Sequence, residues 1–328
     1  MGIIKERRKL NKAIRHSKNV FLMAHKDLDL DALGSQIGLD MLLKKKKKKV
    51  YIIIDDHKHE LGVEKVLREL EGCIDIVRGE DVEKYMYPRI SKNLLIILDT
   101  NKENLVQNSD VLTKFKNKLI IDHHEVGEST IKDAQKIIDI KTSSTCEMIA
   151  NLLEYYDVEI EPYYATILLS GIVLDTNNYT LNTNVETYYA SYYLASMGAS
   201  AKKVQYLMKQ DINDYTERQK LITSIETLNE NVAFTKAPAS TIYRREDLAK
   251  MADTLLFFNN IEASFVVGKI AKDKIGISAR SLEKYDINKI LSKLGGGGDT
   301  TSGAAVIEGK SITQVEQELK KIIKEEGE

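Results

Sequence analysis

Short apolar runs alternate with stretches of helical periodicity in the first part of the chain. Helices are expected over residues 3–17 and 32–47. Four apolar runs hold no charged residue and are each followed by a polar or acidic one; they span residues 20–24, 50–54, 94–98 and 119–121. Unbroken runs of this kind are typical of strands buried on both faces of a sheet. Their alternation with helices indicates βαβ units and a parallel sheet.

The middle of the chain has a mostly helical pattern over residues 145–225. Within it, the apolar segment 167–176 is expected to deliver another acidic residue to the same edge of the sheet as the four apolar runs. Residues 210–230 are polar and helical in pattern, which predicts a connector between two domains.

The last part of the chain follows a different pattern. Residues 263–270 and 274–281 are two β-rich runs separated by a short charged stretch, which predicts a β-hairpin. Helices are expected at 286–294, before a run of glycines, and at 311–326. The predicted fold class is therefore α/β: a parallel-sheet domain with helices on both faces, followed by a smaller α+β domain.

Length and composition agree with two globular domains and exclude some functions. The chain has 328 residues and a formal net charge of −1, so it lacks the basic excess with which proteins bind duplex nucleic acid. Its two cysteines, Cys73 and Cys146, cannot form a disulfide framework, which indicates a reducing compartment. No membrane segment or signal peptide is recognised. We expect a cytoplasmic chain, or the cytosolic part of a membrane-anchored parent protein.

Residues of the types that commonly bind metals follow four of the apolar segments. They are His25, Asp29 and Asp31 after the first, Asp99 after the third, Asp122, His123 and His124 after the fourth, and Asp175 at the end of 167–176. Each alone is more simply a turn or helix-capping residue. Together, carboxylates that meet at one sheet edge repel unless cations lie among them, and mixed Asp and His ligands suit Mn²⁺, Mg²⁺ or Fe²⁺.

The motifs that contain these residues resemble a known family. The segments HKDLDLDALGS, LLIILDT, IDHH and LSGIVLDT resemble four motifs of the DHH phosphoesterase superfamily, and ISARS followed by GGGGD resembles the DHH-associated domain. Residues 171–199 are most similar to the GdpP-type cyclic di-AMP phosphodiesterases. The resemblance covers nearly the whole chain. It implies a DHH domain over 1–205, a helical linker over 206–230 and a DHH-associated domain over 231–328.

The resemblance implies a site for two Mn²⁺ ions, with Mg²⁺ or Fe²⁺ as alternatives. The implied ligands are His25, Asp29, Asp31, Asp99, His123 and Asp175. Asp99 would bridge the ions, His25 and Asp29 would complete one site, and the remaining three ligands would complete the other. Asp122 and His124 would orient ligands and touch the substrate phosphate. Asp99, Asp122, His123 and His124 are therefore the expected catalytic residues.

The resemblance places substrate-binding residues in both domains. They are Ser143, Ser144, Thr145, Ser278, Arg280, Gly295, Gly296, Gly297, Gly298 and Asp299. A simpler interpretation of Ser143, Ser144 and Thr145 is a helix N-cap, and both interpretations stay open. The arginine offers a fork matched to phosphate, and glycines allow backbone N–H groups to approach it closely.

Three motifs depart from the family pattern. The glycine run ends in Asp299 where the family has histidine, which puts a carboxylate where a phosphate is expected. Asp27 and Leu28 replace the usual Asn-Pro, and residues 101–103 read Asn-Lys-Glu instead of His-Arg-Pro. All six implied metal ligands are retained.

Three functions are compatible with these observations. The leading prediction is hydrolysis of cyclic di-AMP to linear pApA. A nanoRNase or pAp phosphatase would keep the chemistry and change the substrate to a short oligonucleotide or to pAp. Because of Asp299, the chain could instead be a weakened enzyme that serves as a cyclic-dinucleotide sensor. The resemblance also implies a homodimer.

Overall fold

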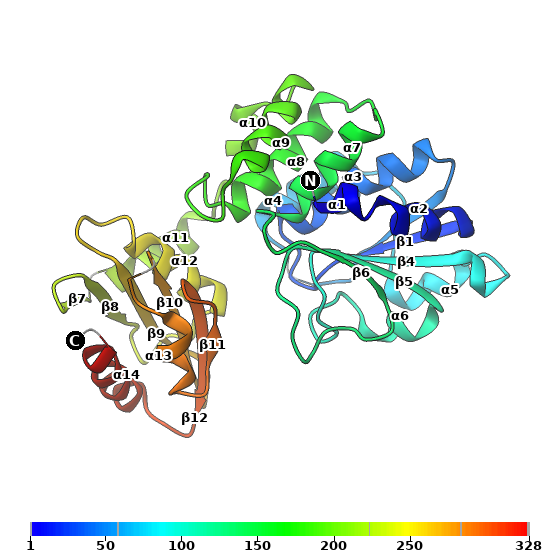
Figure 1. Cartoon of the computed structure of the whole chain (residues 1–328). Helices are drawn as coiled ribbons and strands as arrows, with labels where there is room; N and C mark the ends of the chain where they lie inside the picture. Colours follow the sequence, from blue (N-terminus) through cyan, green and yellow to red (C-terminus); the bar gives the residue numbers. More distant parts are fainter. Residues whose placement is uncertain (1, 58, 223, 283, 327–328) are drawn as a thin grey trace. The chain divides into compact units, whose positions relative to one another are not determined.

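The computed structural model describes residues 2–57, 59–222, 224–282 and 284–326. The chain divides into two units, Met1–Lys209 and Gln210–Glu328, each with its own sheet and core (Figure 1). No helix in the described residues is both long enough and apolar enough to span a bilayer.

A sheet of six parallel strands forms the centre of the first unit, in the order β3-β2-β1-β4-β5-β6. The strands are β1 (Asn19–Met23), β2 (Lys49–Ile53), β3 (Ile76–Val77), β4 (Asn93–Leu98), β5 (Asn117–Asp122) and β6 (Gln135–Ile138). The four apolar runs are confirmed as β1, β2, β4 and β5. The two edge strands carry too little apolar sequence to be recognised. The strand order reverses between β1 and β4, which is where α/β sheets open a crevice for ligands.

Helices cover both faces of this sheet, as the sequence predicts (Figure 1). Along β1, Val20 and Leu22 enter one core and Phe21 and Met23 enter the other, because successive strand residues point to opposite faces. The larger core includes residues of α1 (Gly2–Lys5), α2 (Arg7–His16), α3 (Leu30–Lys45), α4 (Leu61–Glu69), α7 (Thr145–Tyr155), α8 (Pro162–Asp175), α9 (Val185–Ser196) and α10 (Ala201–Leu207). The smaller core includes residues of α5 (Val82–Tyr85) and α6 (Ser109–Lys114).

The segment 167–176 differs from its prediction. It was expected to present its acidic residue like the strands, but it lies in helix α8 and Asp175 is the last helical residue. Residues 165–173 are all buried, and the helix packs against α3, α7, α9 and α10. A helix covered on all sides has no polar face, so its sequence resembles a buried strand.

The second unit has a mixed six-stranded sheet in the order β11-β12-β10-β9-β8-β7. Its strands are β7 (Ile225–Leu228), β8 (Val232–Lys236), β9 (Ala263–Ala271), β10 (Lys274–Ser281), β11 (Gly297–Gly298) and β12 (Ser302–Glu308). The predicted hairpin is confirmed, since β9 and β10 pair antiparallel. The expected helical connector at 210–230 contains α11 (Ile212–Ile222) but also strand β7, which pairs with β8.

Helices lie on both faces of the second sheet as well. Helix α12 (Arg245–Leu255) packs in one core, and α13 (Ile287–Ser292) and α14 (Ile312–Glu326) pack in the other. The helices expected near 286–294 and 311–326 are thereby confirmed. Helix α12 and strand β8 had no distinct signal in the sequence.

Candidate metal centre

The predicted metal ligands meet at the crevice where the strand order reverses. His25 and Asp29 lie after β1, Asp99 directly after β4, and His123 directly after β5. Two further carboxylates come from helices: Asp31 lies in the first turn of α3, and Asp175 ends α8. The structure therefore brings all six together, although only four follow strands.

The six residues form two groups that share Asp99. In one group the ligand atoms of His25, Asp29 and Asp99 lie within 4.8 Å of one another, and in the other those of Asp31, Asp99, His123 and Asp175 do. Asp99 Oδ2 lies 3.4 Å from His25 Nε2, and Asp99 Oδ1 lies 3.4 Å from His123 Nε2. One carboxylate thus presents one oxygen to each histidine, as a bridging ligand would.

The backbone at Asp99 is held in an unusual conformation. Its φ is 58°, in the left-handed region that costs a non-glycine residue about 1–3 kcal/mol. Two contacts fix it: the Asp99 N–H donates to Ile121 O at 3.1 Å, and Thr145 Oγ1 donates to Asp99 Oδ1 at 2.9 Å. Strain of this kind is concentrated at functional sites, where surrounding structure compensates for it.

Asp29 and Asp31 also organise the ends of helices. Asp29 Oδ1 accepts from the N–H groups of Asp31 and Ala32 and so caps α3. The carboxylate of Asp31 is buried and accepts from Thr145 N–H and Cys146 N–H, both at 2.7 Å, at the start of α7. Helix N-termini favour negative charge, so α7 stabilises this carboxylate in the ionised form.

The carboxylates perturb one another strongly. Burial and the charges of Asp99 and Asp175 raise the pKa of Asp31 well above its ordinary value. Burial also raises the pKa of Asp175 to about 6, although the imidazole of His123 acts in the opposite direction. Burial opposes ionisation of Asp99 too, but the facing imidazoles of His123 and His25 hold its pKa well below the usual range. Burial together with this crowding thus disfavours the ionised forms of Asp31 and Asp175.

A divalent cation fits this arrangement. His123 Nε2 is buried and forms no hydrogen bond with any described residue, although it lies 3.1 Å from Asp175 Oδ2. An orphaned imidazole nitrogen between carboxylate oxygens is suited to binding a metal ion. The buried thiol of Cys146 lies nearby, but burial and the charge of Asp31 raise its pKa well above the ordinary value, so it stays protonated. The donor set is therefore oxygen and imidazole, which suits Mn²⁺, Mg²⁺ or Fe²⁺.

Asp122 and His124 lie beside the ligands and are joined to each other. Asp122 Oδ1 accepts from His124 Nδ1 at 2.8 Å and from the backbone N–H of His123 at 2.9 Å. Because a carboxylate only accepts, the proton is on His124 Nδ1, and Nε2 is left for another partner. Asp122 is fully buried, whereas the side chain of His124 is 52% exposed. The side chain of His124 is thus open to solvent, whereas that of Asp122 is not.

Ser143, Ser144 and Thr145 take part in the N-terminus of α7. Ser144 accepts from Glu147 N–H as the N-cap, and Ser143 Oγ donates to Glu147 Oε2 at 2.6 Å. All three residues are at most 1% exposed, and the hydroxyl of Thr145 donates to Asp99. The structure therefore shows the helix-capping role that the sequence left open. A contact with substrate stays a prediction.

The predicted substrate-binding residues of the second unit fall into two places. Ser278 and three of the glycines line a cavity of about 380 Å³ together with Arg245; the glycines are Gly295, Gly296 and Gly297. Gly298, with φ of 156°, lies just beyond in β11. Arg280 does not line this cavity, and its Nε donates to Asp253 Oδ1 at 2.6 Å.

Asp299 is engaged in a turn of its own backbone. Its Oδ1 accepts from Thr301 N–H at 2.7 Å and Ser302 N–H at 2.6 Å, and its Oδ2 accepts from Ser302 Oγ. Burial raises the pKa of Asp299, but these hydrogen bonds outweigh it and the pKa is lowered overall. The carboxylate of Asp299 therefore stabilises the loop between β11 and β12.

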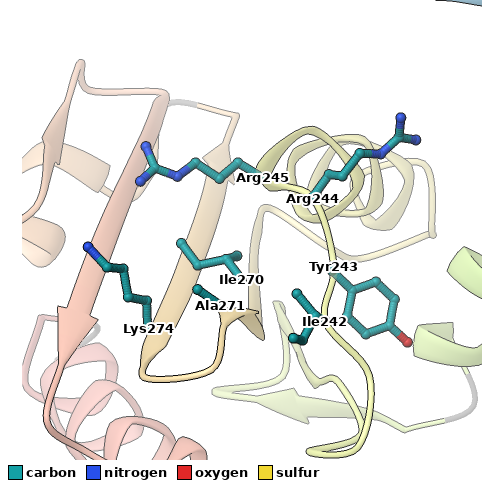
Figure 2. A pocket seen from close by; sticks show the side chains of 7 residues that line it. All are labelled: Ile242, Tyr243, Arg244, Arg245, Ile270, Ala271 and Lys274. Carbon is teal, nitrogen blue, oxygen red and sulfur yellow. The ribbon is translucent and has the colours of Figure 1, made fainter. Parts of the chain in front are cut away.

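A second hollow in the same unit, of about 290 Å³, has cationic residues at its rim (Figure 2). Its lining residues are Ile242, Tyr243, Arg244, Arg245, Ile270, Ala271 and Lys274. Arg244 is paired with Asp247 and Lys274 with Glu308, so most of the positive charge at this rim is balanced. The sequence did not single out this hollow, and its geometry assigns it no function.

Comparison with known families accounts for both units. Residues 19–172 match the DHH family, N-terminal domain, and residues 229–325 match the DHHA1 domain. The chain belongs to the DHH family. This agrees with the resemblance found in the sequence motifs.

Curated relatives of this DHH protein include two bacterial enzymes. The chain is 33% identical over 314 residues to the cyclic-di-AMP phosphodiesterase PdeA of Listeria monocytogenes, covering 94% of this chain and 48% of the relative. It is 32% identical over 322 residues to the cyclic-di-AMP phosphodiesterase GdpP of Bacillus subtilis, covering 96% and 49%. The chain thus spans about half the length of each.

A solved structure has the same fold. The crystal structure of an exopolyphosphatase-related protein from Bacteroides fragilis superimposes with a TM-score of 0.77 at 20% identity, covering 98% of this chain and 97% of that one. At this identity the likeness supports the fold of the DHH protein and does not bear on its substrate.

The packing around Asp31 yields a first prediction. A Cβ at Gly171 would lie 2.6 Å from Cys146 Sγ and 2.9 Å from Asp31 Oδ1. Gly171→Ala is expected to lower the free energy of unfolding by about 1–3 kcal/mol through overpacking, and to weaken Mn²⁺ binding because Asp31 must move. Urea unfolding and calorimetric titration with Mn²⁺ measure the two effects.

Gly127→Ala is the matched control, because nothing lies within 4 Å of a Cβ at that position. It should leave both quantities near those of the wild type. A folded Gly171→Ala variant with unchanged Mn²⁺ affinity would show that this contact does not hold Asp31 in place.

Proposed function

We propose that this chain is a metal-dependent phosphodiesterase that hydrolyses cyclic di-AMP to linear pApA. The observation that carries the proposal is the carboxylate of Asp99, whose two oxygens each face a histidine of a different ligand group. The names of the 33% and 32% identical relatives support the substrate. Family membership supports the phosphoester chemistry.

In this proposal the six ligands would hold two Mn²⁺ ions, one in each group, and Asp99 belongs to both groups. Such a pair supplies an activated water and stabilises negative charge on the phosphate oxygens. The protein's own contribution is to fix the carboxylates before substrate arrives. Asp31 is fixed by the start of α7 and Asp99 by Thr145, so little reorganisation is needed during reaction.

His124 and Asp122 are proposed to act on the substrate phosphate. Asp122 holds one proton on His124 Nδ1, and in the imidazolium form Nε2 carries the second proton, which it can donate to a phosphate oxygen or to the leaving group. The exposure of the His124 side chain agrees with a contact to substrate, whereas the burial of Asp122 agrees with an orienting role.

The second unit is proposed to bind the nucleotide. Its cavity is lined by Ser278, a glycine-rich backbone and Arg245. These residues offer hydroxyl, backbone N–H and guanidinium groups that can donate hydrogen bonds to a phosphate or to the edge of a base. Arg280 and Asp299 stay proposed contributors near it, although both make hydrogen bonds within the unit. The homodimer implied by the family resemblance also stays a prediction.

Hydrolysis of cyclic di-AMP with Mn²⁺, with products resolved by chromatography, tests the proposed reaction. Accumulation of pApA is expected. Parallel reactions with pApA and pAp test the alternatives, because release of mononucleotides alone would assign a nanoRNase or pAp phosphatase activity. Binding of cyclic di-AMP and Mn²⁺ without turnover would contradict the proposal and favour a sensor.

Asp99→Asn tests the role of the shared carboxylate. The amide retains an acceptor for Thr145 but removes the negative charge and one of the two metal-binding oxygens, so one ion loses a ligand and both ions lose the charge between them. We expect kcat to fall by about 10³-fold or more, as when electrostatic stabilisation of a transition state is removed. The thermal midpoint of the metal-free protein should change little. A variant with near wild-type kcat would rule out Asp99 as a bridge.

Asp299→His tests the departure in the glycine-rich loop. If the carboxylate weakens the binding of an anionic substrate, restoring the family's histidine should lower KM with kcat nearly unchanged. The cost is the loss of the accepted hydrogen bonds in the turn, at about 1 kcal/mol each, so the thermal midpoint should fall. A folded variant without a lower KM would overturn this explanation of Asp299.

A further inference from the structure

We propose that two buried amide side chains, Asn101 and Gln107, are positioning residues, one for each of the ligand groups that share Asp99. Both lie in the segment 101–107, which follows the shared carboxylate. Of these two residues the sequence singled out only Asn101, as part of a departure from the family pattern. The inference rests on the proposed function, because it concerns how the two metal sites are held.

Segment 101–107 is attached by backbone hydrogen bonds to both ligand-bearing loops. Towards its end it pairs with the loop after β1, and at its start it pairs with the chain that follows His123 and His124. The hydrogen bonds are Lys26 N to Leu105 O (2.8 Å), Gln107 N to Ala24 O (2.9 Å), Glu103 N to Ser129 O (3.2 Å) and Ile131 N to Asn101 O (2.9 Å). The segment therefore spans the site from one ligand loop to the other.

Gln107 fixes the loop that carries His25. Its side chain is almost fully buried, and Nε2 donates to His25 O at 3.0 Å and to Lys26 O at 3.1 Å. Its Oε1 accepts from Asp55 N–H at 3.0 Å, so every hydrogen-bonding group of the amide is used. Without Gln107, two carbonyl groups next to His25 would lose their donor. The group formed by His25, Asp29 and Asp99 depends on this contact.

Asn101 fixes the loop that carries His123. It is fully buried, and Nδ2 donates to Asp122 Oδ2 at 2.6 Å and to the carbonyls of His124 and Glu125 at 3.2 Å each. Its Oδ1 accepts from Thr130 Oγ1 at 2.9 Å. The amide thus joins both ends of the loop that follows β5, and it holds the carboxylate of Asp122 in place.

The contact with Asp122 extends to the ligand itself. The other oxygen of Asp122 accepts from the backbone N–H of His123 and from His124 Nδ1. A change at Asn101 therefore reaches His123 through one carboxylate, whereas the contacts of Gln107 reach His25 directly. The two amides have no hydrogen-bond partner in common among the described residues, so their effects should fall on different ions.

Calorimetric titration of the whole metal-free chain with Mn²⁺ tests this division. Wild type is expected to bind two ions. Asn101→Ala and Gln107→Ala are each expected to lower the affinity for one of the two ions by about 10–100-fold. This is the usual effect of losing a residue that orients a metal ligand. The other ion should stay near its wild-type affinity. The double variant should bind both ions weakly, because the two amides serve different sites.

Two further variants separate the loss of the amide's hydrogen bonds from the effect of the cavity that alanine would leave. Asn101→Leu and Gln107→Met keep nearly the volume of the side chain and remove the amide without adding charge. Weaker binding of an ion in these variants is therefore due to the lost hydrogen bonds, and neither a cavity nor a new charge explains it.

Asn93→Ala is the matched control. Asn93 is also a buried amide, with Nδ2 donating to Tyr87 O at 2.9 Å and Oδ1 accepting from Tyr87 N–H at 2.7 Å, but it begins β4 at the opposite end of the strand. It should lower the thermal midpoint and leave both ions bound as in wild type.

The outcomes separate the inference from the proposed function. Wild type that fails to bind two ions overturns the proposed function, and the inference with it. If wild type binds two, wild-type affinities in the Asn101 and Gln107 variants would overturn the inference alone. A double variant that keeps one tight ion would also overturn it, because both amides would then serve the same site. Loss of an ion in Asn93→Ala would attribute the effect to general destabilisation.

Discussion

Four carboxylates, those of Asp29, Asp31, Asp99 and Asp175, converge at the carboxyl edge of the parallel sheet, and their mutual repulsion constrains everything around them. The protein offsets part of it with His25, His123 and the start of α7. Burial, and after it the charges of neighbouring carboxylates, still raise the pKa of Asp31 and of Asp175. Added positive charge would relieve the repulsion, so the crowding of these carboxylates favours the binding of a cation.

The same constraint joins the site to the fold. Asp29 and Asp31 are needed where they are for a local reason as well, because they cap α3 and stabilise the start of α7. Helix α8 also approaches closely, since a Cβ at Gly171 would lie 2.9 Å from Asp31 Oδ1. Because these ligands belong to the ends of core helices, the metal site has a rigid frame on one side. On the other side, His25 and His123 lie in loops that need separate attachment.

Much of this arrangement could be predicted from the sequence, and the exceptions have physical causes. The strands β1, β2, β4 and β5 are unbroken apolar runs, and parallel topology places the residues that follow them at one edge. Asp175 was assigned to that edge as though its segment behaved like a strand, because a helix buried on every side has no amphipathic period. The role of Asn101 could not be foreseen, since its partners are backbone carbonyls and a carboxylate brought close only by the fold. In the second unit, hydrogen bonding of Asp299 within its own turn likewise depends on a local geometry that residue type alone does not specify.

Anomalous diffraction at the manganese absorption edge, from crystals of the Mn²⁺-loaded chain, tests the central claim most directly. The account predicts two peaks about 3.5–4 Å apart, with Asp99 contacting both, His25 on one side and His123 on the other. A single peak, or two peaks of which Asp99 contacts only one, would contradict it.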